Sequence, residues 1–391
     1  MSAPRIAVIG AGVAGCGAAL RAAQLGADEI TLIEAGHPGG GSSGLSAGVY
    51  NIQTVDPLDI EIRIRARELL FRLEAAGTLH LARIGNVRVA YTDADMARLA
   101  AARQVQRDLG ATDSLLLDRA ALQELVPDLV TSDLAGGLHG PDDGHLDGHL
   151  LCSALLDEAR ASGVRLLTRT QVVGHERTPG GHRLRTTEGD VAADVVINAA
   201  GAWGSRVGEL LGVRVPLVPQ VHEVVQVQLR RPLPYVVPMT NLYMPGMTGE
   251  GLYFRQDGPD SLIAGMHTYV VQDEGGVADP DDYRRRGSDA YLEQVAEALT
   301  ERFLVEDLGF KPGWTGLYPL SPDGRFILGP HEQDPTVISC TGLGGVGVTM
   351  GSIAGFTAAE WAVTGRPTTV PGAEVLRPDR ATLTDLVGGR P

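Results

Sequence analysis

The chain has 391 residues, enough for two or three hydrophobic cores at roughly 150 residues per domain. Hydrophobic residues make up 43% and charged residues 21%, with 51 Gly and 23 Pro, a composition that excludes collagen-like, coiled-coil and disordered chains. The net charge of −15 leaves no basic surface that would neutralise a nucleic-acid backbone, so we expect no nucleic-acid partner.

Cysteine usage and the N-terminal residues indicate a cytoplasmic protein. Cys16, Cys152 and Cys340 lie far apart without CxxC spacing, which argues against a disulfide scaffold, a thiolate zinc site and a dithiol redox centre. The first residues lead directly into an apolar strand, with no signal-like leader. We expect no membrane span, because no apolar run reaches the length of about 18 residues that one requires.

The first third of the chain reads as the start of an α/β domain. An apolar strand over 6–9, a glycine turn over 10–15, an Ala-rich helix over 13–25 and a second strand over 30–33 form one βαβ unit. A Gly/Ser-rich loop over 37–48 follows, and the apolar spacing then predicts a long helix over 57–77. This order is typical of a doubly wound fold.

Later segments alternate between two layers. Short strands and helices over 87–91 and 115–125 indicate a second domain, to which a β-rich region over 215–264 and an amphipathic helix over 281–303 also belong. The first domain resumes with a helix over 147–161, strands over 163–168, 193–201 and 336–340, and a helix over 352–363. We therefore predict two discontinuous domains: one spans 1–80, 145–215 and 320–391, and the other spans 81–144 and 216–319.

A dinucleotide fingerprint opens the chain. Gly10, Gly12 and Gly15 follow a strand and begin a helix, and Glu34 ends the next strand. The first glycine makes the turn, the second admits the pyrophosphate, the third packs helix on strand, and the acidic residue accepts hydrogen bonds from the ribose. The negative charge of Glu34 disfavours a 2′-phosphate, and the fingerprint alone does not choose between nicotinamide and flavin.

Three further segments are candidates for cofactor contact. Gly41-Ser42-Ser43 offers hydroxyl and N–H groups, although a solvent loop would look the same. Asn198 to Trp203 ends a strand with small residues. Small residues allow close approach of the backbone to a cofactor, and ordinary helix–sheet packing is the alternative explanation. Gly342 to Thr349 contains a second GxGxxG but continues as a helix, so we interpret it as a helix N-terminus directed at a flavin.

Together these segments resemble the D-amino-acid oxidase superfamily of FAD enzymes, in its glycine oxidase, sarcosine oxidase and dimethylglycine dehydrogenase branch. The likeness covers residues 1–380 and also rests on Thr170-Gln171-Val172 and on Trp314 to Gly329. It implies an α/β fold in which a three-layer, Rossmann-like FAD domain is interwoven with an α+β substrate domain built on an antiparallel sheet.

The resemblance also implies a cofactor and its contacts. FAD is expected to bind the residues that match the family's motifs, with Val172 meeting adenine through its backbone: Gly10, Gly12, Val13, Ala14, Gly15, Glu34, Ala35, Ser42, Ser43, Ala47, Val172, Ala200, Gly201, Trp203, Gly344, Gly345, Val346, Gly347, Val348 and Thr349. The implied reaction is hydride transfer from the carbon next to an amine nitrogen to flavin N5, giving an imine that water hydrolyses.

Departures from the family pattern refine these expectations. Gly44 to Ala47 holds no His or Cys where some relatives bond the flavin, so we expect non-covalent FAD. Tyr318 stands where relatives have a carboxylate-binding Arg, and Thr349 stands where sarcosine oxidases have Lys, and both are candidate substrate contacts. Tyr253 aligns with a Lys that activates oxygen in some relatives. The electron acceptor is either oxygen or another acceptor, and the absence of this Lys favours another acceptor.

The β-rich region supplies the catalytic candidates. His222 is a candidate for proton exchange near neutral pH, Tyr253 for orienting the amine, and His267 is a further candidate. Arg255 would hold a carboxylate if its side chain points inward. The alternatives are a satisfied strand histidine for His222 and ordinary sheet packing for Tyr253.

Two questions stay open from the sequence. The His- and Asp-rich segment 139–149 reads as a turn-rich loop, so we expect no metal.

The function we expect is oxidation of a small secondary or tertiary amine or amino acid. The alternatives are a 2-hydroxy-acid dehydrogenase on the same fold and a flavin subunit of a larger amine dehydrogenase, and an oligomer is possible.

Overall fold

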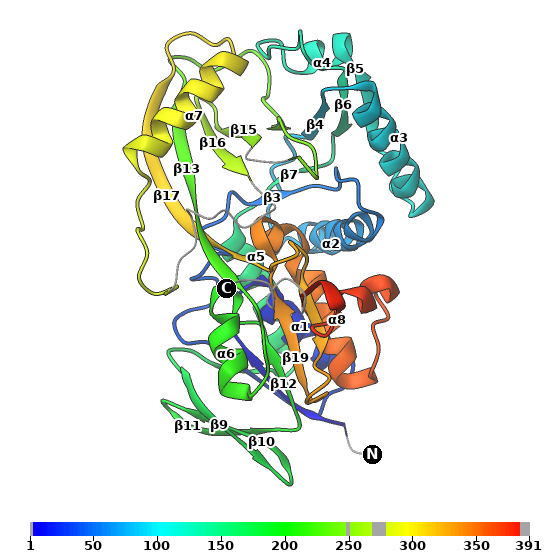
Figure 1. Ribbon diagram of the computed structural model, residues 1–391, viewed down its shortest axis with the longest axis vertical. Helices are drawn as coiled ribbons and strands as arrows, with labels where there is room; N and C mark the ends of the chain where they lie inside the picture. Colours follow the sequence, from blue (N-terminus) through cyan, green and yellow to red (C-terminus); the bar gives the residue numbers. More distant parts are fainter. Residues whose placement is uncertain (1–2, 248–250, 268–278, 384–391) are drawn as a thin grey trace.

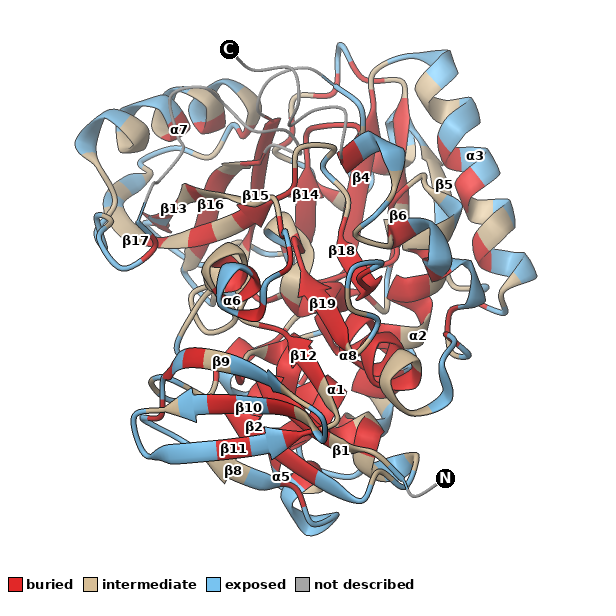
Figure 2. Cartoon of the chain, turned by 60° about the horizontal axis from the view of Figure 1, so that its bottom comes forward, coloured by how far each residue is buried: buried red, intermediate tan, exposed pale blue. Residues whose placement is uncertain are grey.

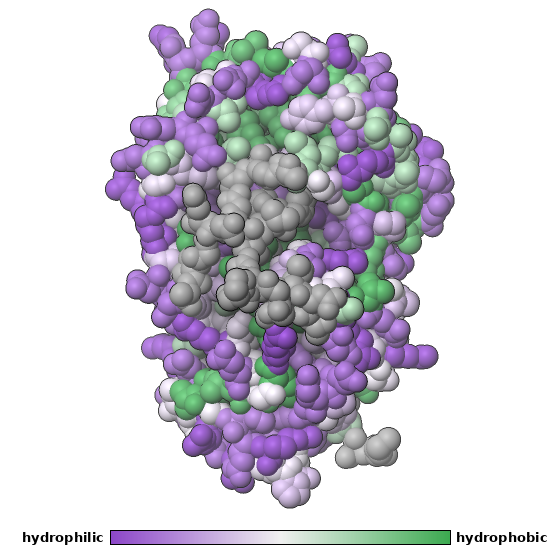
Figure 3. Space-filling view, in the orientation of Figure 1, coloured by the Kyte–Doolittle hydropathy of each residue, from purple (hydrophilic) through white to green (hydrophobic). Residues whose placement is uncertain are grey.

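The computed structural model describes residues 3–247, 251–267 and 279–383. Two sheet-based halves are stacked along the long axis of the molecule, and the chain passes between them several times (Figure 1). Hydrophilic side chains dominate the face seen in Figure 3, in keeping with the excess of acidic residues. Within the described residues, no helix is long and apolar enough to cross a membrane.

One half is built on a six-stranded sheet in the order β18-β19-β12-β1-β2-β8. All neighbouring pairs are parallel except β18 with β19. The strands are β1 (Arg5–Ile9), β2 (Glu29–Ile33), β8 (Arg165–Leu167), β12 (Val195–Asn198), β18 (Ile327–Pro330) and β19 (Val337–Thr341). This sheet confirms the predicted α/β domain, and β8 and β12 are shorter than predicted.

This sheet is the middle one of three layers, because alternate residues of β1 face opposite sides and each face packs against a separate core. Ile6 and Val8 join a core with the helices on one face, whereas Ala7 and Ile9 join a second core on the other face. The helices of the first face are α1 (Val13–Gln24), α2 (Pro57–Ala75), α5 (Gly148–Ala161) and α8 (Gly347–Thr364). Helix α2 begins where predicted because Asp56 caps it and Pro57 occupies its first position.

A three-stranded antiparallel sheet covers the other face, together with α6 (Gly204–Leu211). Its strands are β9 (Val172–Thr178), β10 (Gly181–Thr186) and β11 (Gly189–Ala193). Buried and exposed residues alternate along β10 (Figure 2), as expected for a strand with one face on the core. These three strands are not predicted from the sequence, because charged residues at exposed positions interrupt the apolar pattern.

The other half is an eight-stranded sheet in the order β17-β13-β16-β15-β14-β4-β6-β5. It is antiparallel as predicted, except that β14 pairs with β4 in parallel. The strands are β4 (Asn86–Ala90), β5 (Leu115–Asp118), β6 (Gly136–Gly140), β13 (Val218–Gln228), β14 (Met239–Asn241), β15 (Gly251–Gly258), β16 (Ser261–His267) and β17 (Gly309–Leu320). Its helices are α3 (Asp93–Asp108), α4 (Arg119–Leu125) and α7 (Asp289–Arg302).

The segments of the two halves alternate along the chain. Strands of the six-stranded sheet fall within 1–80, 145–215 and 320–391, and those of the eight-stranded sheet fall within 81–144 and 216–320. A short ribbon of β3 (Val49–Tyr50) and β7 (Gly144–His145) lies where two of these segments meet. Short 3₁₀ helices occupy Gly201–Trp203, Gly344–Val346 and Pro371–Leu376.

Two predicted helices begin at other residues. The helix predicted over 281–303 starts at Asp289, because Ser288 caps it and Asp281 is held instead by Trp203 and Arg206. The last helix begins at Gly347, five residues before the predicted 352, because the glycine loop itself winds into the helix. The early start brings the N-terminus of α8 to the cavity described below.

Candidate active site

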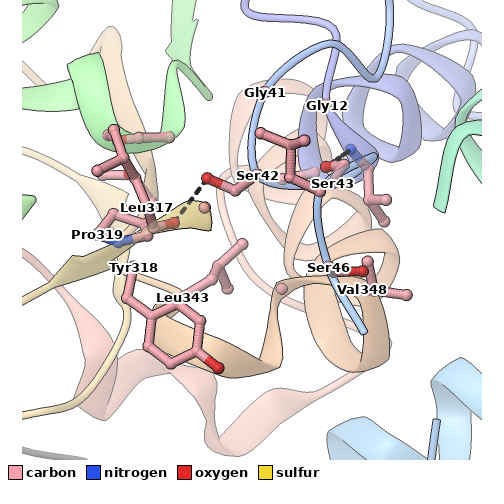
Figure 4. A pocket seen from close by; sticks show the side chains of 18 of the residues that line it. Gly12, Gly41, Ser42, Ser43, Ser46, Leu317, Tyr318, Pro319, Leu343 and Val348 are labelled. Atoms are coloured by element: carbon pink, nitrogen blue, oxygen red, sulfur yellow. Dashed lines mark hydrogen bonds between the residues drawn. The ribbon is translucent and has the colours of Figure 1, made fainter. Parts of the chain in front are cut away.

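A cavity of about 630 Å³ lies between the two halves. Its wall combines the N-terminal ends of α1 and α8, the loop from Glu34 to Val49, the end of β12, and strands β13, β15 and β17. Figure 4 shows part of this wall, where Ser42 reaches across to Leu317 and Tyr318 lies beside Leu343. The cavity therefore joins the dinucleotide fingerprint to the sheet that carries the catalytic candidates.

The three fingerprint glycines take different positions. Gly10 has φ 100°, and a Cβ there would lie 2.6 Å from the carbonyl oxygen of Ala199. Gly12 lines the cavity. Gly15 does not line it: a Cβ on Gly15 would lie 1.8 Å from the Gly10 oxygen, so this glycine packs the helix against the strand. Gly15 therefore faces the Gly10 backbone and Ala199 rather than the cavity, unlike Gly10 and Gly12, which line it.

Glu34 is held in place by two backbone groups. Its Oε2 accepts a hydrogen bond from Ala11 N and its Oε1 accepts one from Gly36 N, both at 2.8 Å. The half-buried carboxylate lines the cavity, and a carboxylate has more acceptor sites than these two bonds use. Glu34 can therefore accept hydroxyl groups of a ribose without moving.

The loop after Glu34 is tied to both halves by its serines. Ser43 Oγ accepts from Val13 N at 3.1 Å, at the first turn of α1. Ser42 Oγ donates to Leu317 O, 2.7 Å away on β17. These two bonds fix the loop as one wall of the cavity (Figure 4). All the cofactor candidates except Gly15 line the same cavity: Gly10, Gly12, Val13, Ala14, Glu34, Ala35, Ser42, Ser43, Ala47, Val172, Ala200, Gly201, Trp203, Gly344, Gly345, Val346, Gly347, Val348 and Thr349.

This set of residues fits an FAD molecule. Neither Gly12 nor Val346, the N-cap residues of α1 and α8, caps its helix with a side chain, so the N-termini of two helices meet one cavity. A Cβ on Gly12 would approach Ser43 Oγ to 3.1 Å and narrow the cradle at this point. Helix N-termini and glycine backbone favour a pyrophosphate, and Glu34 favours a ribose.

Aromatic side chains from the eight-stranded sheet complete the cavity. The rings of His222 and Tyr318 stack with centroids 3.7 Å apart, and the rings of His267 and Tyr243 stack at 4.9 Å. His267 also meets Tyr318 at 5.9 Å with the rings tilted by 60°. Tyr253 is buried on the adjacent strand. The structure thus brings together the predicted His222, Tyr253, His267 and Tyr318 on one wall.

Burial keeps these groups neutral. Desolvation lowers the pKa of His222 to about 3, although a hydrogen bond with the Met266 backbone opposes the shift. The pKa of His267 falls well below its usual value because of burial first and the nearby His222 and arginine charges second. Burial raises the pKa of Tyr253 to about 12. The wall therefore offers neutral imidazole and phenol groups near pH 7.

Two of the predicted substrate contacts have structural partners of their own. Thr349 lines the cavity, and its Oγ1 donates to Val49 O at 2.7 Å. Arg255 lies outside the cavity lining, so the condition for its binding a carboxylate, that its side chain points inward, is not met. Its guanidinium pairs with Asp257 at 2.7 Å and donates to Ala47 O at 2.9 Å, which holds it away from the cavity.

Two arginines that the sequence analysis missed do line the cavity. Arg63 lies on α2 and donates to Asn51 Oδ1 at 2.7 Å, and Arg88 lies on β4. They are only 3% and 1% exposed. A signal was present in both cases, because Arg63 interrupts the apolar face of a helix and Arg88 stands between Val87 and Val89 in an apolar strand.

The His- and Asp-rich segment is spread over several contacts. Asp143 pairs with Arg67 at 3.1 Å, His139 lies on β6, and His149 stacks near His37. Among the residues that the structure describes, no group of three or more His, Cys, Asp or Glu side chains is arranged to hold a metal ion.

Comparison with known proteins places the chain among flavoproteins. Glycine oxidase of Geobacillus kaustophilus is 26% identical over 369 residues, covering 91% of this chain and 92% of that protein. Mitochondrial dimethylglycine dehydrogenase of Mus musculus is 24% identical and covers 92% of this chain, which spans only 42% of that protein. The crystal structure of L-proline dehydrogenase from P. horikoshii superposes with a TM-score of 0.78 at 22% identity, covering 96% of this chain and 97% of that one.

A family model described as FAD dependent oxidoreductase matches residues 5–361. This range contains the fingerprint, both helix N-termini and the aromatic wall of the cavity. The chain therefore belongs to the family of FAD-dependent oxidoreductases.

Proposed function

We propose that this enzyme oxidises the C–N bond of a small secondary or tertiary amine or amino acid, such as sarcosine, dimethylglycine or glycine. The similar proteins act on glycine, dimethylglycine and L-proline by their names. The observation that carries the proposal is the neutral wall of His222, His267, Tyr253 and Tyr318 on the cavity that the fingerprint opens. Such a wall suits an amine that must lose its proton before it is oxidised.

His222 and Tyr253 are the proposed amine contacts. His222 Nε2 is buried and has no hydrogen-bond partner among the described residues, so the N–H of a neutral secondary amine or amino acid would relieve the cost of this buried acceptor. The Tyr253 hydroxyl stays protonated near neutral pH and can donate to the amine lone pair. Together they would orient a neutral amine and exclude water from it.

FAD, when bound, supplies the two-electron oxidant that takes a hydride from the carbon next to nitrogen. The resulting imine is hydrolysed by water to the smaller amine and a carbonyl compound. We propose that FAD is held without a covalent bond. Cys340 lines the cavity, but burial raises the pKa of its thiol to about 12, which keeps it from acting as a nucleophilic thiolate.

The test is anaerobic reduction of the purified yellow protein, followed by absorbance. Sarcosine, dimethylglycine, glycine, L-proline and D-amino acids are compared with 2-hydroxy acids of matched size. Bleaching by an amine, with the carbonyl product trapped in equal amount, supports the proposal. Bleaching by hydroxy acids alone supports the 2-hydroxy-acid dehydrogenase, and no bleaching until a partner protein is added supports the flavin subunit.

Reoxidation identifies the electron acceptor. Because Tyr253 stands where oxygen-activating relatives carry Lys, we propose that the acceptor is not oxygen. Admitting air to the amine-reduced enzyme should restore the colour slowly, whereas an artificial acceptor dye should restore it within the mixing time. Fast reoxidation by air with release of hydrogen peroxide would contradict this part of the proposal. Denaturation in the same sample should release free FAD, which tests the non-covalent attachment.

A further inference from the structure

Arg88 is a fully buried cation in the wall of the cavity. It is 1% exposed on β4, and its neighbours Val87 and Val89 belong to an apolar core. Its Nε donates to Gln53 O at 2.6 Å and its Nη1 donates to Tyr243 O at 3.0 Å. The Tyr243 ring lies 4.9 Å from its guanidinium carbon. N–H groups on Nη1 and Nη2 remain for a further acceptor, because a guanidinium carries five.

No carboxylate balances this charge. Among residues 3–247, 251–267 and 279–383, no Asp or Glu lies within ion-pair distance of Arg88. Two other buried arginines, Arg67 and Arg255, both have such partners. Burying a charged group without an opposite charge is costly, so an uncompensated arginine that lines a cavity marks a site for an anionic ligand.

Strand register places Arg88 in one row with the proposed amine contact. Arg88 pairs with Asn241 on β14, Asn241 pairs with Tyr253 on β15, and Tyr253 pairs with Gly265 on β16. Paired residues of neighbouring strands point to the same face of a sheet. At about 4.8 Å per strand, the Cα atoms of Arg88 and Tyr253 lie about 10 Å apart.

The row therefore has a polarity. Its Arg88 end is cationic, and Arg63 from α2 adds a second buried guanidinium to the same cavity. Towards the other end lies Tyr253, which pairs with Gly265, and the neutral ring of His267 follows two residues after Gly265 on β16. Both arginines contribute to lowering the pKa of His267, so their positive charges act within reach of the aromatic wall.

We propose that Arg88 binds a carboxylate of the substrate and makes the enzyme specific for amines that carry one. The inference rests on the proposed function for the identity of the amine, whereas the carboxylate site is tested separately below. Arg88 would hold the carboxylate in charge-assisted hydrogen bonds and orient the amine towards Tyr253 and His222. This assigns to β4 the anchoring role that the sequence analysis gave to Arg255 on β15.

Binding without turnover tests the site. Acetate and acetamide have nearly the same shape and differ in charge, and each is titrated into the FAD-loaded enzyme while its heat of binding and the flavin absorbance are followed. We expect wild-type enzyme to bind acetate at least tenfold more tightly than acetamide. Arg88→Met should abolish this preference, and Arg88→Lys should retain part of it because the charge remains without the planar fork.

Arg255→Met is the matched control. Arg255 is also a buried arginine of the same sheet that donates to backbone carbonyls, but it pairs with Asp257 and lies off the cavity. Its variant should lower thermal stability and keep the wild-type preference for acetate. If Arg88→Met and Arg88→Lys both bind acetate as tightly as wild type, or if Arg255→Met loses the preference equally, the inference is wrong.

The same variants separate this inference from the proposed function. With sarcosine and N-methylethanolamine as substrates, Arg88→Met should raise KM for sarcosine at least tenfold and change KM for N-methylethanolamine by less than threefold. Should no amine reduce the enzyme while acetate binding still depends on Arg88, the proposed function fails and the carboxylate site stands. Should amines reduce it with no effect of Arg88 on either KM or acetate binding, the carboxylate site fails alone.

Discussion

The rings of His222 and Tyr318 stack with their planes within 17° of each other. The two residues belong to neighbouring antiparallel strands, where His222 pairs with Gly316 and Tyr318 pairs with Gln220. This diagonal contact fixes the plane of the imidazole, whose Nε2 has no partner among the described residues. Tyr318 therefore acts on the proposed amine contact through its ring, as a positioning residue.

Replacing the ring of Tyr318 should lower kcat/KM more than removing its hydroxyl. Tyr318→Phe keeps the stack, and we expect kcat/KM for the best amine to fall by less than threefold. Tyr318→Leu removes an aromatic pair worth about 0.5–1.5 kcal/mol and frees the imidazole, so kcat/KM should fall tenfold or more. Stopped-flow reduction of both variants measures this. Equal losses in Phe and Leu variants would show that the hydroxyl carries the effect.

Glu34→Gln should weaken FAD binding while the protein stays folded. The amide replaces one of two carboxylate oxygens that accept backbone N–H groups, so an NH₂ group would face either Ala11 N or Gly36 N. Hydrogen bonds to charged groups contribute about 1.5–3 kcal/mol, which corresponds to a Kd for FAD at least tenfold higher. Fluorescence quenching of FAD by the apoprotein measures Kd, and an unchanged Kd would remove Glu34 from the ribose site.

Acid should destabilise the protein through its buried neutral histidines. Burial lowers the pKa of His331 to about 4, although Asp379 and Asp334 oppose the shift, and its Nε2 is 2.8 Å from Ser339 Oγ. An unfolded histidine titrates near 6.5, so the unfolded chain binds more protons between pH 6.5 and 4. The stability that this residue contributes is therefore complete above pH 6.5 and is lost as pH falls to 4.

His331→Gln isolates this contribution. The free energy of unfolding of the wild type should fall by up to about 1.4 kcal/mol per pH unit for this one histidine between pH 6.5 and 4. The variant should be less stable at pH 7 and should lose stability less steeply on acidification. Unfolding midpoints at pH 4.5, 5.5, 6.5 and 7.5 give the comparison. Parallel curves for the two proteins would mean that the pKa of His331 is the same in the folded and unfolded chains.

The residues predicted for the nucleotide side of the site are identified by local signals in the sequence. Gly10, Gly12 and Glu34 follow from a short strand, a turn and the end of the next strand, and the structure places all three on the cavity. The position of the helix N-terminus and of the free backbone N–H groups in such a turn is determined by residues that are close together in the sequence. The same holds for α2, whose start is fixed by Asp56 and Pro57.

The substrate side depends on strand register, which the sequence does not contain. Tyr253 and Arg255 are two residues apart on β15, so alternation alone gives them the same face. Only the pairing of β15 with β14, and of β14 with β4, shows that Tyr253 shares a row with Arg88. Asp257 and Ala47 hold the Arg255 side chain away from the cavity. The parallel pairing of β4 with β14 joins segments about 150 residues apart, and no local pattern predicts it.

Gly345 should couple to Tyr318 in a double-mutant cycle. A Cβ on Gly345 would lie 2.4 Å from Tyr318 Cε2, so Gly345→Ala must displace the ring and loosen its stack on His222. We expect Gly345→Ala to lower kcat/KM at least tenfold in the wild type and much less in Tyr318→Leu, where no ring remains to be displaced. A coupling of about 0.5–3 kcal/mol is usual for residues in contact. If Gly345→Ala lowers kcat/KM by the same factor in both backgrounds, its effect arises from contact with the cofactor. Gly345 is then not needed for the approach of Tyr318.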